Sequence, residues 1–220
     1  MVRPTPAELK PRKSPRQARS AVTVDAIHTA AIQVLLAEGV GRLTTTRVAE
    51  RAGVSVGTMY QYYPHKEALM FAIIQHHVGS IIDTMLSAAS GLSGQTLDQI
   101  SNGLVNAWLD IKIEDIAVSR ATYGLAAEFD ISELMRREGE RFAHALGELL
   151  VSASDAVVAD PQATAFMLIA VMGGSVRNVL EQGALDAEIA ILRAELPLVC
   201  RAYLAAGSRM RSELKSVRQV

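Results

Sequence analysis

One short stretch of the chain concentrates side chains that can hydrogen-bond to another molecule. Between Leu43 and Lys66 these are hydroxyl, amide and guanidinium groups, carried by Thr45, Thr46, Arg47, Ser55, Thr58, Tyr60, Gln61 and Tyr62. Groups of these types, at this density, suit contacts to the phosphates and base edges of a nucleic acid. The pattern therefore indicates recognition of a polyanion rather than catalysis.

Two short helices joined by a tight turn must hold these groups. Thr44 to Thr46 offer hydroxyl caps for a helix that runs to Ala52, and Ser55 offers the cap for the next one, to about Tyr62. Gly53 between them supplies the positive φ that a tight turn needs. Ala49 is a small residue where the helices must cross closely, and four apolar residues can close a miniature core beneath the turn: Val48, Ala52, Val54 and Met59. The polar set is then predicted to face outward, and the major groove, about 12 Å wide, admits one such helix.

The charge of the chain is divided unevenly along its length. Residues 1–66 carry a net charge of +6, residues 67–206 carry −10 and residues 207–220 carry +3, within an overall charge of −1. A basic end beside an acidic body favours contact of that end with a polyanion. A solvated basic tail explains the same pattern equally well, so charge alone does not choose between the two.

Helical periodicity extends over almost the whole chain, without strand alternation or internal repeats. Residues 1–19 hold four of the seven prolines and are interpreted as a flexible basic arm. We expect a helix-turn-helix domain over 20–65, a helical domain over 66–206 and a basic tail over 207–220. Longer helices are predicted near 22–38, 66–89, 96–113, 114–128, 131–155, 160–183 and 186–206. The predicted fold class is all-α.

The segment Leu43–Leu69, LTTTRVAERAGVSVGTMYQYYPHKEAL, resembles the DNA-binding signature of the TetR family of transcriptional repressors. The resemblance covers roughly residues 22–69. It implies that three N-terminal helices bind DNA and that a fourth links them to a core that binds a small ligand. It further implies a homodimer formed by the last two long helices. The C-terminal domains of this family diverge widely, so the resemblance does not identify the ligand.

By position, the resemblance assigns roles within the two short helices. Thr45 and Thr46 begin the helix that leans on the DNA backbone, and Thr46 falls where some members contact a base. Val56, Gly57 and Thr58 begin the recognition helix, where the family touches bases and phosphates.

The same comparison extends to the end of the recognition helix. Tyr60 matches a tyrosine that contacts phosphate, and Gln61 and Tyr62 match variable positions that read bases. Lys66 matches a phosphate-binding lysine at the start of the fourth helix. A cation there is unfavourable with the helix dipole unless an anion also binds.

Two neighbouring residues depart from the family pattern. Tyr63 stands where phenylalanine is commoner, so its hydroxyl needs a partner or a path to solvent. His65 replaces a more usual small capping residue at the start of the fourth helix. Met59 and Tyr63 are predicted to be core residues.

The acidic body is where a small-molecule effector would bind. Trp108 and Tyr123 are the best candidates, because each combines an apolar ring with a polar tip that can orient a ligand. The other candidates are an apolar residue and four polar ones: Phe129, Asn106, Arg120, Glu128 and Arg177. Many methionines and few aromatic residues suggest a hydrophobic effector.

The last two predicted helices carry more apolar surface than one core requires. The helix over 160–183 is apolar nearly all round between Ala165 and Gly174, and Gly173, Gly174 and Ser175 permit close approach of another backbone. Isologous pairing of both helices with a second copy would bury the surplus. Burial inside a larger monomeric core is the alternative.

Several classes of protein are disfavoured by what the sequence contains. It has no recognisable catalytic motif, and we expect neither an enzyme nor a cofactor. His76 and His77 are adjacent, so they cannot form the i, i+4 pair that zinc prefers, and no metal site is expected. The single Cys200 suits a reducing cytoplasm and reads as a small buried hydrophobe. The longest apolar run, of ten residues, is too short for a membrane span.

These observations predict a cytoplasmic, homodimeric, sequence-specific transcriptional regulator. Its partners would be a palindromic double-stranded DNA operator and a small hydrophobic effector that releases it from that operator. The alternative is a helical small-molecule-binding protein or enzyme whose basic arm only increases solubility.

Overall fold

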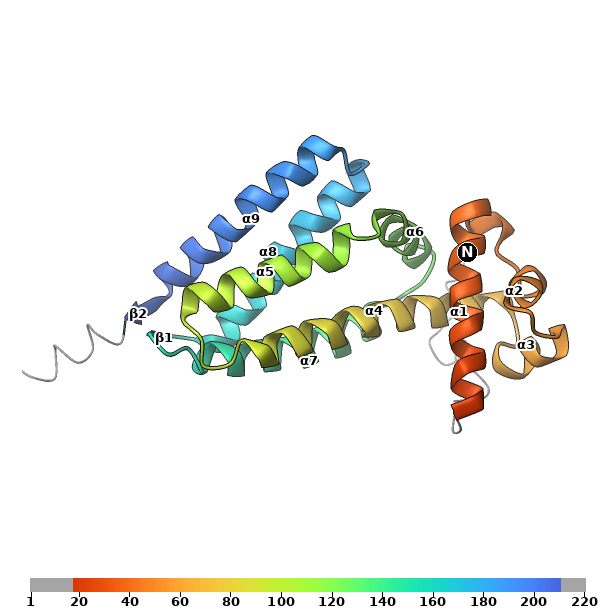
Figure 1. Ribbon diagram of the computed structural model, residues 1–220, viewed down its shortest axis with the longest axis horizontal. Helices are drawn as coiled ribbons and strands as arrows, with labels where there is room; N and C mark the ends of the chain where they lie inside the picture. Colours follow the sequence, from red (N-terminus) through yellow and green to blue (C-terminus); the bar gives the residue numbers. More distant parts are fainter. Residues whose placement is uncertain (1–17, 211–220) are drawn as a thin grey trace, which may run out of the picture. The chain divides into compact units, whose positions relative to one another are not determined.

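The computed structural model describes residues 18–210, which are mainly helical (Figure 1). Its elements are α1 (Ala18–Glu38), the 3-10 turn η1 (Val40–Arg42), α2 (Thr45–Ala52), α3 (Val56–Tyr62), α4 (Lys66–Gly91), α5 (Leu97–Ile113), α6 (Ile116–Ala126), α7 (Ser132–Val151), β1 (Ala156–Val158), α8 (Pro161–Gln182), α9 (Asp186–Ala206) and β2 (Ser208–Met210). The all-α fold class is confirmed. Residues 1–17 of the predicted basic arm and 211–220 of the predicted tail lie outside the described residues.

Packing divides the chain into two units. Unit 1 contains the residues up to Gly79 together with Ala117–Leu134, and unit 2 contains Ser80–Ile116 and the residues from Met135 onward. Helix α4 begins in unit 1 and ends in unit 2. Unit 1 therefore includes the predicted helix-turn-helix range over 20–65 and extends beyond it.

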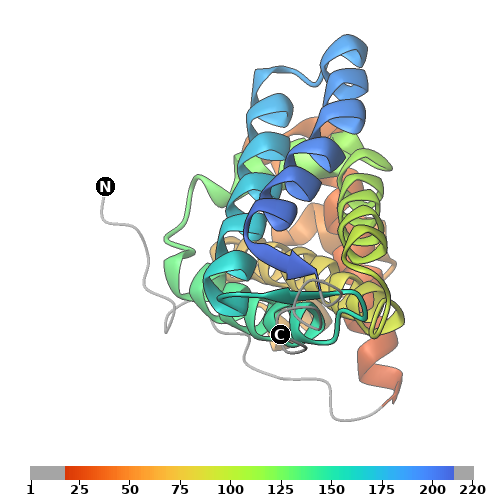
Figure 2. The ribbon, with the colours of Figure 1, turned by 90° about the vertical axis from the view of Figure 1, so that its left-hand side faces the viewer.

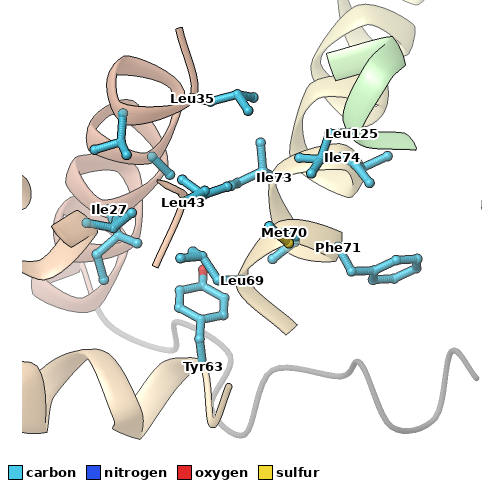
Figure 3. Packing of buried hydrophobic residues seen from close by; sticks show 14 of the residues in the cluster. Ile27, Leu35, Leu43, Tyr63, Leu69, Met70, Phe71, Ile73, Ile74 and Leu125 are labelled. Atoms are coloured by element: carbon cyan, nitrogen blue, oxygen red, sulfur yellow. The ribbon is translucent and has the colours of Figure 1, made fainter. Parts of the chain in front are cut away.

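Unit 1 has a hydrophobic core formed by α1, α2, α3, the first half of α4 and α6. Figure 3 shows Ile27 of α1, Leu43, and Tyr63 gathered around Leu69 and Ile73 of α4. Each of these five residues is at most 2% exposed. The core fixes the start of α4 against α1 and so provides the support on which α2 and α3 rest.

Unit 2 is a bundle in which α5 packs against α8 and α9, and these two helices pack side by side (Figures 1 and 2). The helix starts follow local sequence. Thr96 and Gln99 form a capping box before α5, and the Asp160 carboxylate caps α8, which has Pro161 at its first position. Gly183, at φ 119°, ends α8.

Several helix boundaries differ from the prediction. Helix α1 begins at Ala18 rather than near residue 22, so the last two residues of the predicted arm are helical. Helix α6 is shorter, Ile116–Ala126, and α7 ends at Val151 rather than near Asp155. The residues that follow α7 form β1, which pairs antiparallel with β2. This small sheet, visible in Figure 2, was not predicted, because a strand of three residues is too short to display alternation.

Helices α4 and α8 are each long and apolar enough to span a membrane by length and composition. The ten-residue run in the sequence did not indicate this. Core helices of globular proteins pass the same test, and α4 supplies buried residues from Ala68 to Ile74 to the core of unit 1.

Candidate DNA interface

The turn between α2 and α3 is built by three residues acting locally. The Thr44 side chain accepts a hydrogen bond from the Arg47 N–H and caps α2, and the Ser55 hydroxyl accepts one from the Thr58 N–H and caps α3. Gly53 adopts the left-handed conformation, at φ 67° and ψ 26°. These features agree with the sequence prediction and fix α3 as a separate helix directly after the turn.

Two residues of α3 decide which way the helix faces. Met59 is 0% exposed and Tyr62 is 6% exposed, and both belong to the core of unit 1. Gly57 and Gln61 are exposed, and Tyr60 is 44% exposed. The opposite face of α3 is therefore open to a partner.

The predicted outward orientation of Tyr62 is wrong. Tyr62 is three residues after Met59, so it lies on the same side of the helix and packs into the core. Thr45 is also buried, at 6% exposure, contrary to its predicted outward position. Its hydroxyl lies 3.5 Å from the Tyr60 hydroxyl, so it contacts the side chain of α3 that faces outward.

The arginines of α2 are held by groups on α1. Arg47 forms an ion pair with Glu38, and the Arg51 Nε donates to the Gln33 Oε1 at 2.8 Å. Arg47 remains 39% exposed in its side chain, so it is still accessible from solvent. These α1 partners could not be predicted from local sequence, because they lie nine and eighteen residues away along the chain.

Tyr63 finds the hydroxyl partner that its sequence context required. Its hydroxyl lies 3.0 Å from the Nε2 of His28, which is 8% exposed, and the His76 ring centre lies 4.6 Å from that of His28. Burial, followed by the nearby His76, lowers the pKa of His28 to about 4. Burial also raises the pKa of Tyr63 well above its ordinary value. The prediction that Met59 and Tyr63 are core residues is confirmed.

The start of α4 is capped by histidine rather than by a small residue. The Ala68 N–H donates to the Nδ1 of His65 at 3.1 Å, so the imidazole caps the helix in place of a hydroxyl. Lys66 follows, with a side chain that is 57% exposed and 3.9 Å from the Glu67 carboxylate. An exposed ammonium group thus stands at the helix start, next to one carboxylate.

The two best effector candidates, Trp108 and Tyr123, lie in different units. In unit 2 the Trp108 indole N–H donates to the Met172 carbonyl oxygen of α8 at 2.9 Å, so its polar tip is already used by the protein. The Lys112 ammonium lies 5.1 Å from the centre of the Trp108 ring, and burial lowers the pKa of Lys112 to about 8. Lys112 was not among the residues predicted from the sequence, although its i+4 spacing from Trp108 indicates that the two side chains are neighbours. Tyr123, half-buried in unit 1, stays a prediction.

The remaining effector candidates differ in burial. Phe129 is 5% exposed and packs in the core of unit 1, with its ring 6.2 Å from that of Phe71. The four polar candidates are exposed: Asn106, Arg120, Glu128 and Arg177. The Arg177 Nε also donates to the Glu181 carboxylate at 2.7 Å. Asn106 and Arg177 belong to unit 2, whereas Arg120, Glu128 and Phe129 belong to unit 1, and the effector site made of these residues stays a prediction.

Among residues 18–210, no cluster of three or more histidine, cysteine, aspartate or glutamate side chains is arranged to hold a metal ion. Cys200 is 1% exposed, as expected of a small buried hydrophobe.

Two family models match the chain over most of its length. One describes bacterial regulatory proteins of the tetR family and matches residues 21–73, and the other describes a tetracyclin repressor-like C-terminal domain and matches residues 96–204. The chain belongs to the TetR family. In this TetR-family protein, the segment matched by the first model, residues 21–73, contains the turn, α3 and the start of α4.

Curated relatives are similar to this TetR-family protein over only part of their length. The nucleoid occlusion factor SlmA of Haemophilus influenzae is 30% identical over 104 residues, which is 47% of each chain. SlmA of Haemophilus ducreyi is 27% identical over 105 residues, 48% of this chain and 51% of that one. The chain thus spans about half the length of the curated relatives it matches.

Solved structures share the fold over more of the chain. A TetR-family transcriptional regulator from Mesorhizobium loti has a TM-score of 0.69 at 20% identity and covers 86% of this chain and 98% of its own. SmeT, the repressor of a Stenotrophomonas maltophilia multidrug efflux pump, has a TM-score of 0.63 at 18% identity and covers 86% and 93%. The fatty acid degradation regulator FadR of Bacillus halodurans has a TM-score of 0.63 at 19% identity and covers 86% and 96%. At these identities the likeness concerns the fold alone.

Proposed function

We propose that this TetR-family protein is a transcriptional repressor that binds a palindromic operator and is released by a small hydrophobic effector. The observation that carries the DNA-binding part is the open face of α3, held outward by the buried Met59 and Tyr62. Thr46, Tyr60 and Gln61 are exposed beside it, and Lys66 follows at the start of α4. Hydroxyl, amide and ammonium groups on one small helical surface match the groups exposed in a major groove.

Homodimerisation is supported by unpartnered apolar side chains on the two C-terminal helices. Phe166 of α8 is 67% exposed, and Ile191, Val199 and Leu198 of α9 are 62%, 49% and 46% exposed. Gly174 is exposed, and a side chain there would meet nothing within 4 Å. Apolar residues concentrated in this way are typical of an interface, and a two-fold pairing would bury the patch on both copies.

A symmetric dimer explains why the operator would be palindromic. Two copies of α3 can read equivalent half-sites in successive major grooves, about 34–36 Å apart. An effector that binds better to the form of the dimer unable to reach both half-sites releases it, by a coupling of about 1–3 kcal/mol.

Solved structures with the same fold support a repressor that binds a small organic molecule. SmeT is the repressor of a multidrug efflux pump, and it was also solved in complex with triclosan. Another structure of the same fold is a multidrug binding protein complexed with imidazole. The proposal for this chain extends to action in the cytoplasm, where its DNA would lie, and to a role without catalysis.

Fluorescence anisotropy with two duplexes tests the proposal. One duplex carries DNA from beside the protein's own gene and the other carries random DNA of equal length. Preference for the first duplex, together with a dimeric mass by light scattering, is the expected result. Equal binding of both duplexes would indicate a non-specific DNA-coating protein, and binding of neither would favour the helical small-molecule-binding alternative.

A further inference from the structure

Gly57 occupies a position on α3 where the protein's own structure does not require glycine. Its φ is not in the left-handed region, and an added Cβ would meet only the Ser55 Oγ, at 3.8 Å, which is an ordinary contact. Glycine is nevertheless among the least favourable residues for a helix. Folding alone therefore gives no reason for glycine here.

Gly57 lies on the exposed face of α3, where the absence of a side chain leaves room for a partner. With 3.6 residues per turn, Gly57 lies opposite the buried Met59 and Tyr62, at the centre of the exposed face of α3. Val56 and Tyr60 form one edge of that face and Gln61 forms the other. A partner that approaches this face meets bare backbone at its centre.

The Val56–Tyr60 edge is apolar and exposed. Val56 is 41% exposed and Tyr60 is 44% exposed, four residues apart on the same side of α3. The Tyr60 hydroxyl lies 3.5 Å from that of Thr45 on α2, which directs the polar end of Tyr60 toward α2. Val56 has no polar atom in its side chain, so it cannot hydrogen-bond to the partner, and the contact that it favours is with an apolar group.

In the major groove of DNA, the apolar group that distinguishes one base pair from another is the 5-methyl group of thymine. We propose that Val56 packs against the 5-methyl group of a thymine in each half-site, at a depth in the groove that the absence of a side chain on Gly57 permits. This inference rests on the proposed DNA-binding function and adds to it the base chemistry that α3 selects.

Deoxyuridine substitution tests the thymine contact directly, because it removes only the methyl group. The full chain is first used to select a duplex from a random pool, and each thymine of the selected site is then replaced by deoxyuridine. At one thymine per half-site we expect an affinity loss of about fourfold, the factor for burial of one methyl group. Val56→Ala should lose sensitivity to that substitution, whereas Val56→Thr, which keeps a branched methyl, should retain it.

Gly57→Ala tests the close approach, with Gly124→Ala as a matched control. Gly124 is likewise an exposed helical glycine, on α6, with no neighbour within 4 Å of an added Cβ. Both variants should keep or raise the midpoint of thermal unfolding. Only Gly57→Ala should weaken binding of the selected duplex, by about tenfold, as expected when a base contact is lost.

The possible results of these experiments distinguish a failure of the thymine contact from a failure of the proposed DNA-binding function. A chain that enriches no sequence from the random pool overturns the proposed function and the inference with it. An enriched site without a sensitive thymine, equal sensitivity in Val56→Ala and the wild-type protein, or wild-type affinity in Gly57→Ala overturns the inference alone.

Discussion

The buried histidine of α1 makes the stability of unit 1 depend on pH. His28 is 8% exposed, its Nε2 contacts the Tyr63 hydroxyl, and its ring lies against that of His76. Burial is the main reason that its pKa falls from 6.5 to about 4, while His76 lowers it further and Asp25 acts in the opposite sense. The folded protein thus protonates this ring less readily than the unfolded chain does.

The direction and size of the effect follow from that difference. Above pH 6.5 the ring is neutral in both states, and its full contribution to stability is present. As the pH falls from 6.5 towards 4, the unfolded chain takes up a proton that the folded state does not, so the free energy of unfolding decreases. The loss reaches about 2 kcal/mol at pH 5 and about 3 kcal/mol once the pH is below 4.

Urea unfolding followed by circular dichroism at several pH values between 7.5 and 4.5 measures this loss. The variant His28→Gln removes the titrating group and keeps a polar side chain beside Tyr63. Its free energy of unfolding should fall less steeply with acid than that of the wild-type protein, by about 2 kcal/mol at pH 5. The control is His144→Gln, because the His144 side chain is 73% exposed and pairs with Glu148 on the surface. Parallel curves for His28→Gln and the wild-type protein would refute the argument.

Three further outcomes are expected. Lys66→Ala should weaken DNA binding evenly across sequences and reduce the slope of log affinity against log salt by about one. Tyr60→Phe should also weaken DNA binding. Salt titrations that match those of the wild-type protein would contradict both contacts. Phe166→Glu and Ile191→Glu should each shift the mass measured by sedimentation from dimer to monomer, because each puts a charge on the exposed apolar face of α8 or α9. A dimer that stays intact in both variants would place the interface elsewhere. Burial raises the pKa of Cys200 to about 11, so a thiol reagent at pH 8 should label it only after unfolding, and rapid native labelling would contradict that burial.

Features that depend on a few neighbouring residues could be predicted. Thr44, Gly53 and Ser55 specify the two caps and the turn through their own conformational preferences, and Asp160 with Pro161 does the same for α8. The all-α class follows from periodicity over long segments. These signals depend on residues close together in the sequence, so they can be recognised without knowledge of the fold.

The orientation of side chains within a short helix was harder to predict. Tyr62 combines an apolar ring with a polar hydroxyl, so its residue type is compatible with either face of α3. Only the position of the core below Met59 decides that it is buried. Thr45 was misjudged for the same reason.

The sequence by itself therefore determined the helical class, the turn and the residue types available to contact DNA. The tertiary structure alone decided which of those residues face outward, that Glu38 and Gln33 hold the arginines of α2, and that Tyr63 meets His28 across 35 residues of chain. The physical reason is that caps and turns depend on adjacent residues, whereas burial and pairing depend on segments that only the folded chain brings together.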